Sequence, residues 1–363
     1  MSSMTTAGAR TLVRSDVIVI GGGVVAVVLA ALTRFVGGGA VLAFACAALA
    51  VTLLASLVGR SVEQLGDRFG PGATGVLQSA LGNLPELFIA LFALRAGLVD
   101  VVKAALIGSI LANLLLVLGL CFVVGGLKHG TQKLDSERAR SIIVLMVLSV
   151  AALVLPSLAH FLHTPASKHE NTLSLIVSAI LLLLFVLTLP ASLRRGSNLQ
   201  TEESMQAAPP RWPVALAVGL LALAAVLAAF VSDWFVHALE PAMATLHISD
   251  AFAGLVIVAI AGNAIENVVG VQLAAKNRSE YAFSVVINSP MQIALVLAPV
   301  LVILSQVLGF AALTLVFSPM LIVSVAIAVI LSAFITFDGE SNWIEGAALI
   351  AVYVIIAASF WWG

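Results

Sequence analysis

The sequence contains two similar six-residue segments, LGNLPE at residues 81–86 and AGNAIE at residues 261–266. The offset that aligns Gly82 with Gly262 also aligns Ser109 with Ser289 without a gap. Chance readily supplies one shared Gly-Asn pair, but Gly, Asn, Glu and Ser in a single register indicate an internal repeat. The chain is therefore predicted to consist of two related halves.

Apolar residues surround both segments over most of the chain. Of the 363 residues, 61% are apolar and 10% are Asp, Glu, Lys or Arg, whereas a soluble domain has about 25% charged residues. This composition, with a mean hydropathy of +1.16, excludes a soluble globular protein. The apolar runs are unbroken, as over residues 175–189, so they do not fit the alternating strands of an outer-membrane β-barrel. Because backbone groups in lipid must be hydrogen-bonded internally, the runs predict membrane-spanning helices.

The predicted fold class is an all-α polytopic membrane protein with about eleven transmembrane helices, since a spanning helix needs roughly 20 apolar residues. The predicted spans are residues 15–33, 40–58, 72–95, 101–125, 139–162, 171–193, 213–237, 250–275, 281–305, 311–335 and 342–362. The repeated segments fall in the third and eighth spans, so the two copies cross the membrane in opposite directions. Inverted repeats of this kind are typical of secondary transporters, which bind substrate near the midplane where the repeats meet.

The predicted organisation is two inverted five-helix repeats plus an extra N-terminal helix. Residues 1–38 hold a cytoplasmic N-terminus and the first helix, residues 39–193 form the first repeat, and residues 213–363 form the second. Residues 194–212 are rich in Ser, Gln, Glu and Pro and predict a cytoplasmic linker between the repeats.

The distribution of positive charge predicts the orientation in the membrane. When loops are assigned alternately, 13 of the 17 Lys and Arg residues fall on the side that holds the N-terminus. Cytoplasmic loops carry such an excess, so we expect the N-terminus in the cytoplasm and the C-terminus outside. Acidic loop residues, among them Glu240, Asp250, Glu340 and Glu345, are expected at the outer face. The short chain without a targeting segment suits a bacterial cytoplasmic membrane.

Two glutamates of the repeated segments lie deep within their predicted spans. Glu86 and Glu266 are about 14 and 16 residues into helices that rise about 1.5 Å per residue, and a carboxylate at such depth indicates a functional site. Asn83 and Asn263 precede them by about one turn and share their helix face. The other side chains predicted for the site are those of Ser109, Ser289, Asn113 and Gln292. Six or more oxygens that include two carboxylates suit a hard cation such as Ca²⁺.

The paired glutamates also predict how the cation is moved. Two ionised carboxylates in one cavity repel each other, and one Ca²⁺ or two protons neutralise both. An empty, doubly charged site is costly to carry across the membrane, so alternating access predicts an obligatory exchange of cytoplasmic Ca²⁺ for external H⁺. The sequence holds no phosphate loop, dinucleotide fingerprint or nucleophile elbow. We therefore expect a gradient-driven transporter and no enzyme, with Ca²⁺ and H⁺ as substrates and without ATP, nucleic acid or a cofactor.

These motifs resemble those of the CAX-type Ca²⁺/H⁺ exchangers, the cation/proton exchanger branch of the Ca²⁺/cation antiporter superfamily. The resemblance rests on GNLPE at 82–86 with GSILANLLLVLG at 108–119, on GNAIE at 262–266 with QIAL at 292–295, and on DGESNWIEG at 338–346. It implies that Glu86 and Glu266 bind Ca²⁺ or protons. The chain departs from the family at Asn267, where His is common, and in a linker that keeps only Glu202 and Glu203 of an acidic segment.

Two alternatives remain open from the residues. One is an Na⁺/H⁺ or K⁺/H⁺ antiporter on the same scaffold, which competition between Ca²⁺ and Na⁺ would separate from a Ca²⁺ exchanger. The other is a cation channel in which the glutamates form a selectivity ring. One Glu in each repeat favours the exchanger. The residues give no prediction of the oligomeric state.

Overall fold

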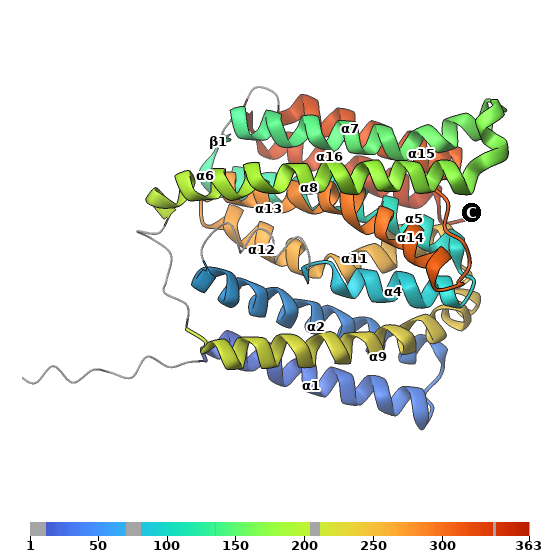
Figure 1. Cartoon of the computed structure of the whole chain (residues 1–363). Helices are drawn as coiled ribbons and strands as arrows, with labels where there is room; N and C mark the ends of the chain where they lie inside the picture. Colours follow the sequence, from blue (N-terminus) through green and yellow to red (C-terminus); the bar gives the residue numbers. More distant parts are fainter. Residues whose placement is uncertain (1–11, 70–80, 135, 204–210, 337–338, 363) are drawn as a thin grey trace, which may run out of the picture.

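Helices that lie roughly side by side make up nearly all of the described chain (Figure 1). The computed structural model describes residues 12–69, 81–134, 136–203, 211–336 and 339–362, and its described side chains exclude those of residues 67–69, 136–142, 189–203 and 264–266. In chain order the elements are α1 (Arg14–Phe35), α2 (Ala40–Phe69), α4 (Leu84–Arg95), α5 (Val99–Leu111), η1 (Ala112–Val117), α6 (Leu118–His129), β1 (Gln132–Lys133), α7 (Ser136–Phe161), η2 (Pro165–His169), α8 (Glu170–Glu203), α9 (Val214–Leu246), α10 (Asp250–Phe252), η3 (Ala253–Val258), α11 (Ala259–Gly262), α12 (Ala264–Ala275), α13 (Ser279–Gln292), η4 (Ile293–Leu297), α14 (Ala298–Val307), α15 (Pro319–Thr336), β2 (Glu340–Ser341) and α16 (Trp343–Ser359).

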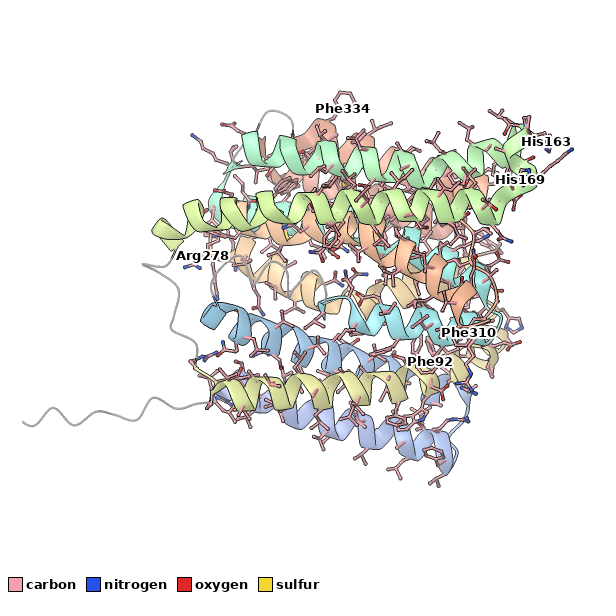
Figure 2. The ribbon with its side chains drawn as sticks, viewed as in Figure 1. Phe92, His163, His169, Arg278, Phe310 and Phe334 are labelled. Carbon is pink, nitrogen blue, oxygen red and sulfur yellow. The ribbon has the colours of Figure 1, made fainter. Side chains whose placement is uncertain are left out.

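The lengths and apolarity of these helices fit a polytopic membrane protein. Eight helical segments of the described chain are long and apolar enough to cross a membrane, and a ninth results if the bent pair that includes α11 and α12 is one span. Two further predicted spans are shorter in the described chain. α4, which lies within 72–95, has 12 residues, and α16 has 17. Outward-facing apolar side chains such as Phe334, labelled in Figure 2, are largely exposed, as lipid-facing residues are. The prediction of an all-α polytopic membrane protein is confirmed.

The two repeats match closely around the repeated segments. α4 and α12 have 12 residues each, and they begin at the equivalent positions Leu84 and Ala264. The residue before each helix has nearly the same backbone, with φ −94° and ψ 20° at Asn83 and φ −86° and ψ 23° at Asn263. The helices that follow, α5 and α13, also begin at equivalent positions, and each passes into a π-helical turn, η1 or η4. The repeat in the sequence is therefore a repeat in the structure.

The extra N-terminal helix α1 packs along α2 and α9, and the three helices lie side by side in Figure 1. The buried carboxylate of Asp16 ties their ends together. It lies 2.8 Å from Arg60 Nη1 of α2 and 3.8 Å from Arg211 Nη2, and it accepts a hydrogen bond from Trp212 Nε1 at 3.3 Å. A buried charge is tolerated when it is paired and hydrogen-bonded in this way. The cluster therefore ties α1 to α2 and to the residues that lead into α9.

The short strands correct one prediction about the loops. β1 and β2 pair antiparallel, with Lys133 opposite Glu340. Because Lys133 lies in a loop on the N-terminal side of the predicted topology, Glu340 lies on that side too, and Glu345 follows it in the first turn of α16. The expectation that Glu340 and Glu345 share one face of the molecule with Glu240 and Asp250 is wrong. The loop between the tenth and eleventh spans returns to the side of the N-terminus, where it joins the basic loop after α6.

Close contact between backbones joins the repeats along α5 and η3. A Cβ atom at Gly108 would overlap the backbone of Leu255, and one at Gly254 would overlap the carbonyl of Val101. Small residues permit such close approach between helices in membranes. The position of η3 against α5 therefore depends on these two glycines.

Substitution of Gly108 by Ala is expected to lower the thermal stability of the protein, because Leu255 can move away only by shifting its backbone. Overpacking of this kind costs about 1–3 kcal/mol. The measurement is thermal unfolding of the purified variant. The matched control is Gly219→Ala in α9, where an added Cβ meets nothing within 4 Å, so that it should be neutral or slightly stabilising. Equal unfolding temperatures for the two variants would contradict the backbone contact.

Candidate functional site

The break between α11 and α12 and the start of α4 place the repeated segments partway along the bundle (Figure 1). α11 ends at Gly262 and α12 begins at Ala264, and the bend across this break is 60°. In the first repeat, α4 begins after Asn83 with Pro85 in its first turn, where the missing N–H of proline is not needed. Broken helices leave backbone groups without partners inside their own helix, and transporters use such groups to bind ions.

The carboxylate of Glu86 lies at the contact between the repeats. Glu86 stands in the first turn of α4 and is 8% exposed. A Cβ atom placed on Gly262 would be 2.7 Å from Glu86 Cγ and 3.2 Å from Glu86 Oε1. The helix break of the second repeat therefore packs directly against the glutamate of the first.

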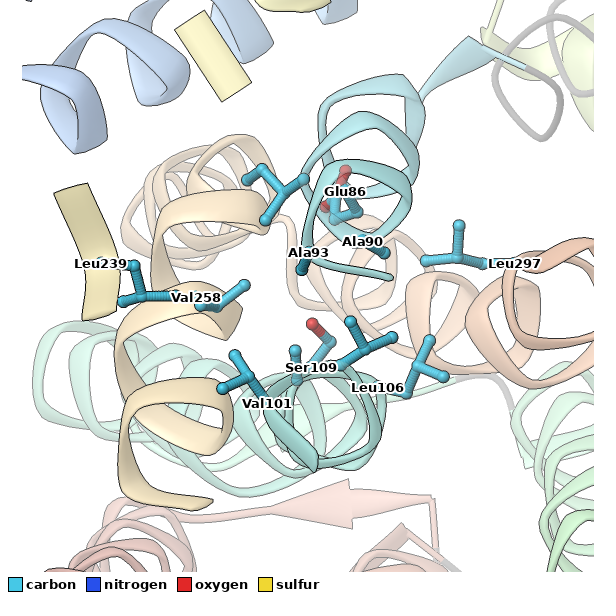
Figure 3. A pocket seen from close by; sticks show the side chains of 12 residues that line it. Glu86, Ala90, Ala93, Val101, Leu106, Ser109, Leu239, Val258 and Leu297 are labelled. Atoms are coloured by element: carbon cyan, nitrogen blue, oxygen red, sulfur yellow. The ribbon is translucent and has the colours of Figure 1, made fainter. Parts of the chain in front are cut away.

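A cavity adjoins Glu86 and extends towards the turn between α4 and α5 (Figure 3). Its empty space, which includes the open solvent at its mouth, amounts to about 430 Å³. Its polar lining consists of Glu86 and Ser109, and the rest is apolar, with Ala93 and Val101 near the turn and Leu239 and Val258 from the second repeat. Apolar walls leave the carboxylate as the strongest attraction for a cation that enters this space.

Asn263 is the centre of a hydrogen-bond network between the repeats. Its Nδ2 donates to Ser109 Oγ at 2.8 Å and to the carbonyl of Ala259 at 2.7 Å. Its Oδ1 accepts from Asn113 Nδ2 at 2.8 Å and from Ser289 Oγ at 3.3 Å. Ser109 and Asn113 belong to the first repeat, so this network joins the core helices of both halves.

The structure brings together seven of the predicted site residues. Asn83 Nδ2 donates to Gln292 Oε1 at 3.4 Å, which connects the residue before α4 to the end of α13. The side chains of Asn83, Glu86, Ser109, Asn113, Asn263 and Ser289 are all buried. The eighth, Glu266, belongs to α12, and its side chain lies outside the described residues.

Two contributions to the site were not predicted from the sequence. Gly262 contacts Glu86, although the sequence indicated only that Gly262 belongs to the repeated segment. Thr52 of α2 donates a hydrogen bond of 3.5 Å to the carbonyl of Ala261, in the last turn of α11. The only signal for Thr52 in the sequence is a polar residue within an apolar run.

Known proteins with similar sequences are cation exchangers. Residues 39–193 and 216–362 match the sodium/calcium exchanger protein family. The chain is 39% identical over 325 residues to the Ca(2+)/H(+) antiporter ChaA of Bacillus subtilis, covering 87% of this chain and 91% of that one. It is 35% identical over 333 residues to a Ca(2+)/H(+) antiporter of Aphanothece halophytica, covering 87% and 89%.

Solved structures agree with these sequence matches. The structure of native YfkE superimposes with a TM-score of 0.81 at 34% identity, covering 95% of this chain and 99% of that one. The crystal structure of the H⁺/Ca²⁺ exchanger CAX has a TM-score of 0.72 at 17% identity, covering 94% and 91%, and shows a shared fold. From its matched segments and its similarity over most of its length, the chain belongs to the sodium/calcium exchanger protein family.

Proposed function

We propose that this protein is a Ca²⁺/H⁺ antiporter that moves Ca²⁺ out of the cytoplasm in exchange for external H⁺. Relatives named Ca(2+)/H(+) antiporter match it over most of both chains. The structural observation that supports the proposal most is the contact of the buried Glu86 with Gly262 of the other repeat, beside a cavity. An Na⁺/H⁺ or K⁺/H⁺ antiporter and a channel have no specific observation in their favour.

The chemistry of the site suits Ca²⁺, which takes six to eight oxygen ligands in flexible geometry. Glu86 and, by the repeat, Glu266 are the proposed carboxylate ligands. Asn83, which precedes the first turn of α4, and the carbonyl groups at the end of α11, where Gly262 contacts Glu86, are proposed to complete the set. The remaining predicted residues, Asn113, Asn263, Ser109, Ser289 and Gln292, are hydrogen-bonded to one another or to Asn83 and are proposed to hold the site in shape.

The charges make the exchange obligatory in this proposal. An occupied site is neutral, with either one Ca²⁺ or two protons on the glutamates. The empty site carries two negative charges in a low-dielectric region, which makes its reorientation costly. Rocking of residues 39–193 against residues 213–363 then exposes only a loaded site to the other side. The linker of residues 194–212 and the N-terminus are placed in the cytoplasm and the C-terminus outside, in a bacterial cytoplasmic membrane.

Proton flux in liposomes tests the proposal. Purified protein is reconstituted with a pH-sensitive dye inside, the interior is made acidic, and Ca²⁺, Na⁺ or K⁺ is added outside in turn. The expected result is proton efflux with Ca²⁺ and none above protein-free liposomes with Na⁺ or K⁺. Efflux with Na⁺ or K⁺ but without Ca²⁺ would reassign the substrate. A Ca²⁺ current that needs no proton gradient would show a channel instead.

A further inference from the structure

The side-chain amide of Asn263 uses its full hydrogen-bonding capacity within the protein. A carboxamide offers two N–H donors and two acceptor lone pairs. In Asn263 the donors bind Ser109 Oγ and the carbonyl of Ala259, and the acceptors receive Asn113 and Ser289. An amide engaged in this way has no lone pair left for a cation. In the conformation of this structure Asn263 therefore acts as a brace.

The corresponding amide of the first repeat is held differently. The repeat would pair Asn83 with Ser289, just as Asn263 pairs with Ser109. In the described part of the chain, Asn83 instead donates to Gln292 over a long 3.4 Å, and Ser289 Oγ lies in the network around Asn263. Two segments with matching sequence and backbone thus have unlike hydrogen bonds.

Inverted repeats explain such a difference when each half adopts the conformation of the other in the opposite access state. We propose that Asn263–Ser109 and Asn83–Ser289 are alternative locks, one closed in each access state of the transporter. In this structure the Asn263–Ser109 lock is closed, and the cavity lined by Ala93 is present. In the opposite state Ser289 leaves Asn263 and binds Asn83, while Ser109 is released. The inference rests on the proposed function, because only a transporter alternates between two such states.

Asn113 makes the two locks unequal. Its Nδ2 binds Asn263 at 2.8 Å and the carbonyl of Ser109 at 2.9 Å. The equivalent residue of the second repeat is Ile293, which has no polar side-chain group to offer. The lock on Asn263 therefore has a supporting hydrogen bond from Asn113, for which the equivalent position of the second repeat offers no counterpart. Asn113 is a positioning residue that favours the state seen in this structure.

Rates of cysteine modification test the two locks without requiring ion transport. Cys46 and Cys121 are first replaced by Ala, since both are free thiols. Ala93→Cys then reports the cavity of this structure, and Leu273→Cys, at the equivalent position of the second repeat, reports the opposite state. The ratio of their rates with a cationic methanethiosulfonate, in protein embedded in nanodiscs, follows the balance between the two states. Ala96→Cys, at the exposed end of α4, is the control for general reactivity.

The locks predict changes of opposite sign. Ser109→Ala should lower the ratio of the Ala93→Cys rate to the Leu273→Cys rate by about threefold to tenfold, as expected for loss of one hydrogen bond. Asn113→Ala should lower it as well, and it separates the lock from a change of the cavity wall because Asn113 does not line the cavity. Ser289→Ala removes a bond in both states, but it should raise the ratio, because the bond lost in the opposite state is the counterpart of the 2.8 Å Asn263–Ser109 bond, whereas the bond lost in this state is the longer 3.3 Å bond to Asn263.

Changes in the same direction for all three variants, or an unchanged ratio, would overturn the proposal of alternative locks. Such a result would not contradict Ca²⁺/H⁺ exchange, because proton flux in liposomes tests that function separately. Conversely, a wild-type protein without Ca²⁺-driven proton flux would fail as an antiporter whatever the labelling ratio. If a lock variant also changed the modification rate of Ala96→Cys, its effect on the ratio would come from altered folding. The lock would then be overturned for that variant.

Discussion

Replacement of Glu86 by Gln is expected to abolish Ca²⁺-driven proton flux, with a loss of about 100-fold or more, while the protein still folds. Gln has nearly the shape of Glu, so it preserves the packing against Gly262. It is neutral at every pH, so it can neither release a proton nor contribute charge to a Ca²⁺ site. A loss of about 2.7 kcal/mol in ion binding already corresponds to 100-fold. The measurement is initial proton efflux from liposomes at a Ca²⁺ concentration well below that which saturates the wild-type protein.

Two further variants make this result specific. Glu266→Gln should be equally inactive, because the repeat assigns it the same role from the other half. Glu240→Gln should exchange normally, because Glu240 is an exposed residue of α9. Size-exclusion profiles and unfolding temperatures like those of the wild type would show that the inactive variants are folded. Robust flux by both Glu86→Gln and Glu266→Gln would contradict the two-glutamate mechanism.

Substitution of Gly262 by Ala is expected to weaken the apparent affinity for Ca²⁺ by about tenfold or more. The added Cβ would lie 2.7 Å from Glu86 Cγ, which is well inside van der Waals contact, so the carboxylate must move. A displacement that costs about 1.4 kcal/mol of ion binding gives the tenfold change. The measurement is the Ca²⁺ concentration that gives half-maximal proton efflux.

A control variant tests whether the effect of Gly262→Ala is steric. Gly21→Ala in α1 adds the same methyl group where nothing lies within 4 Å, and it should leave the Ca²⁺ dependence unchanged. Gly262 ends α11 with an ordinary helical backbone, so the substitution introduces no backbone strain of its own. An unchanged Ca²⁺ dependence for Gly262→Ala would show that Glu86 does not set the affinity at this contact.

Much of the fold follows from local properties of the sequence. Long apolar runs require helices in lipid because the backbone must satisfy its own hydrogen bonds, and the two Gly-Asn segments stand where α4 begins and where α11 ends. The constant offset between the repeats predicted that Asn83 and Asn263 are equivalent, and their backbone angles agree. The loop with Glu340 joins the tenth and eleventh predicted spans, so alternation of the loops already assigns it to the side of the N-terminus, and its pairing with Lys133 agrees. Its placement at the outer face did not follow from the predicted spans.

The sequence by itself determined the helices, the repeat and which polar residues belong to the repeated segments, because each of these depends on periodicity, composition or register along the chain. Only the tertiary structure decided how the halves touch. The contact of Gly262 with Glu86, the hydrogen bond from Thr52 and the unequal bonding of Asn83 and Asn263 join residues distant in sequence. Such contacts depend on the packing of whole helices, and two segments with the same local signal can then take up different partners.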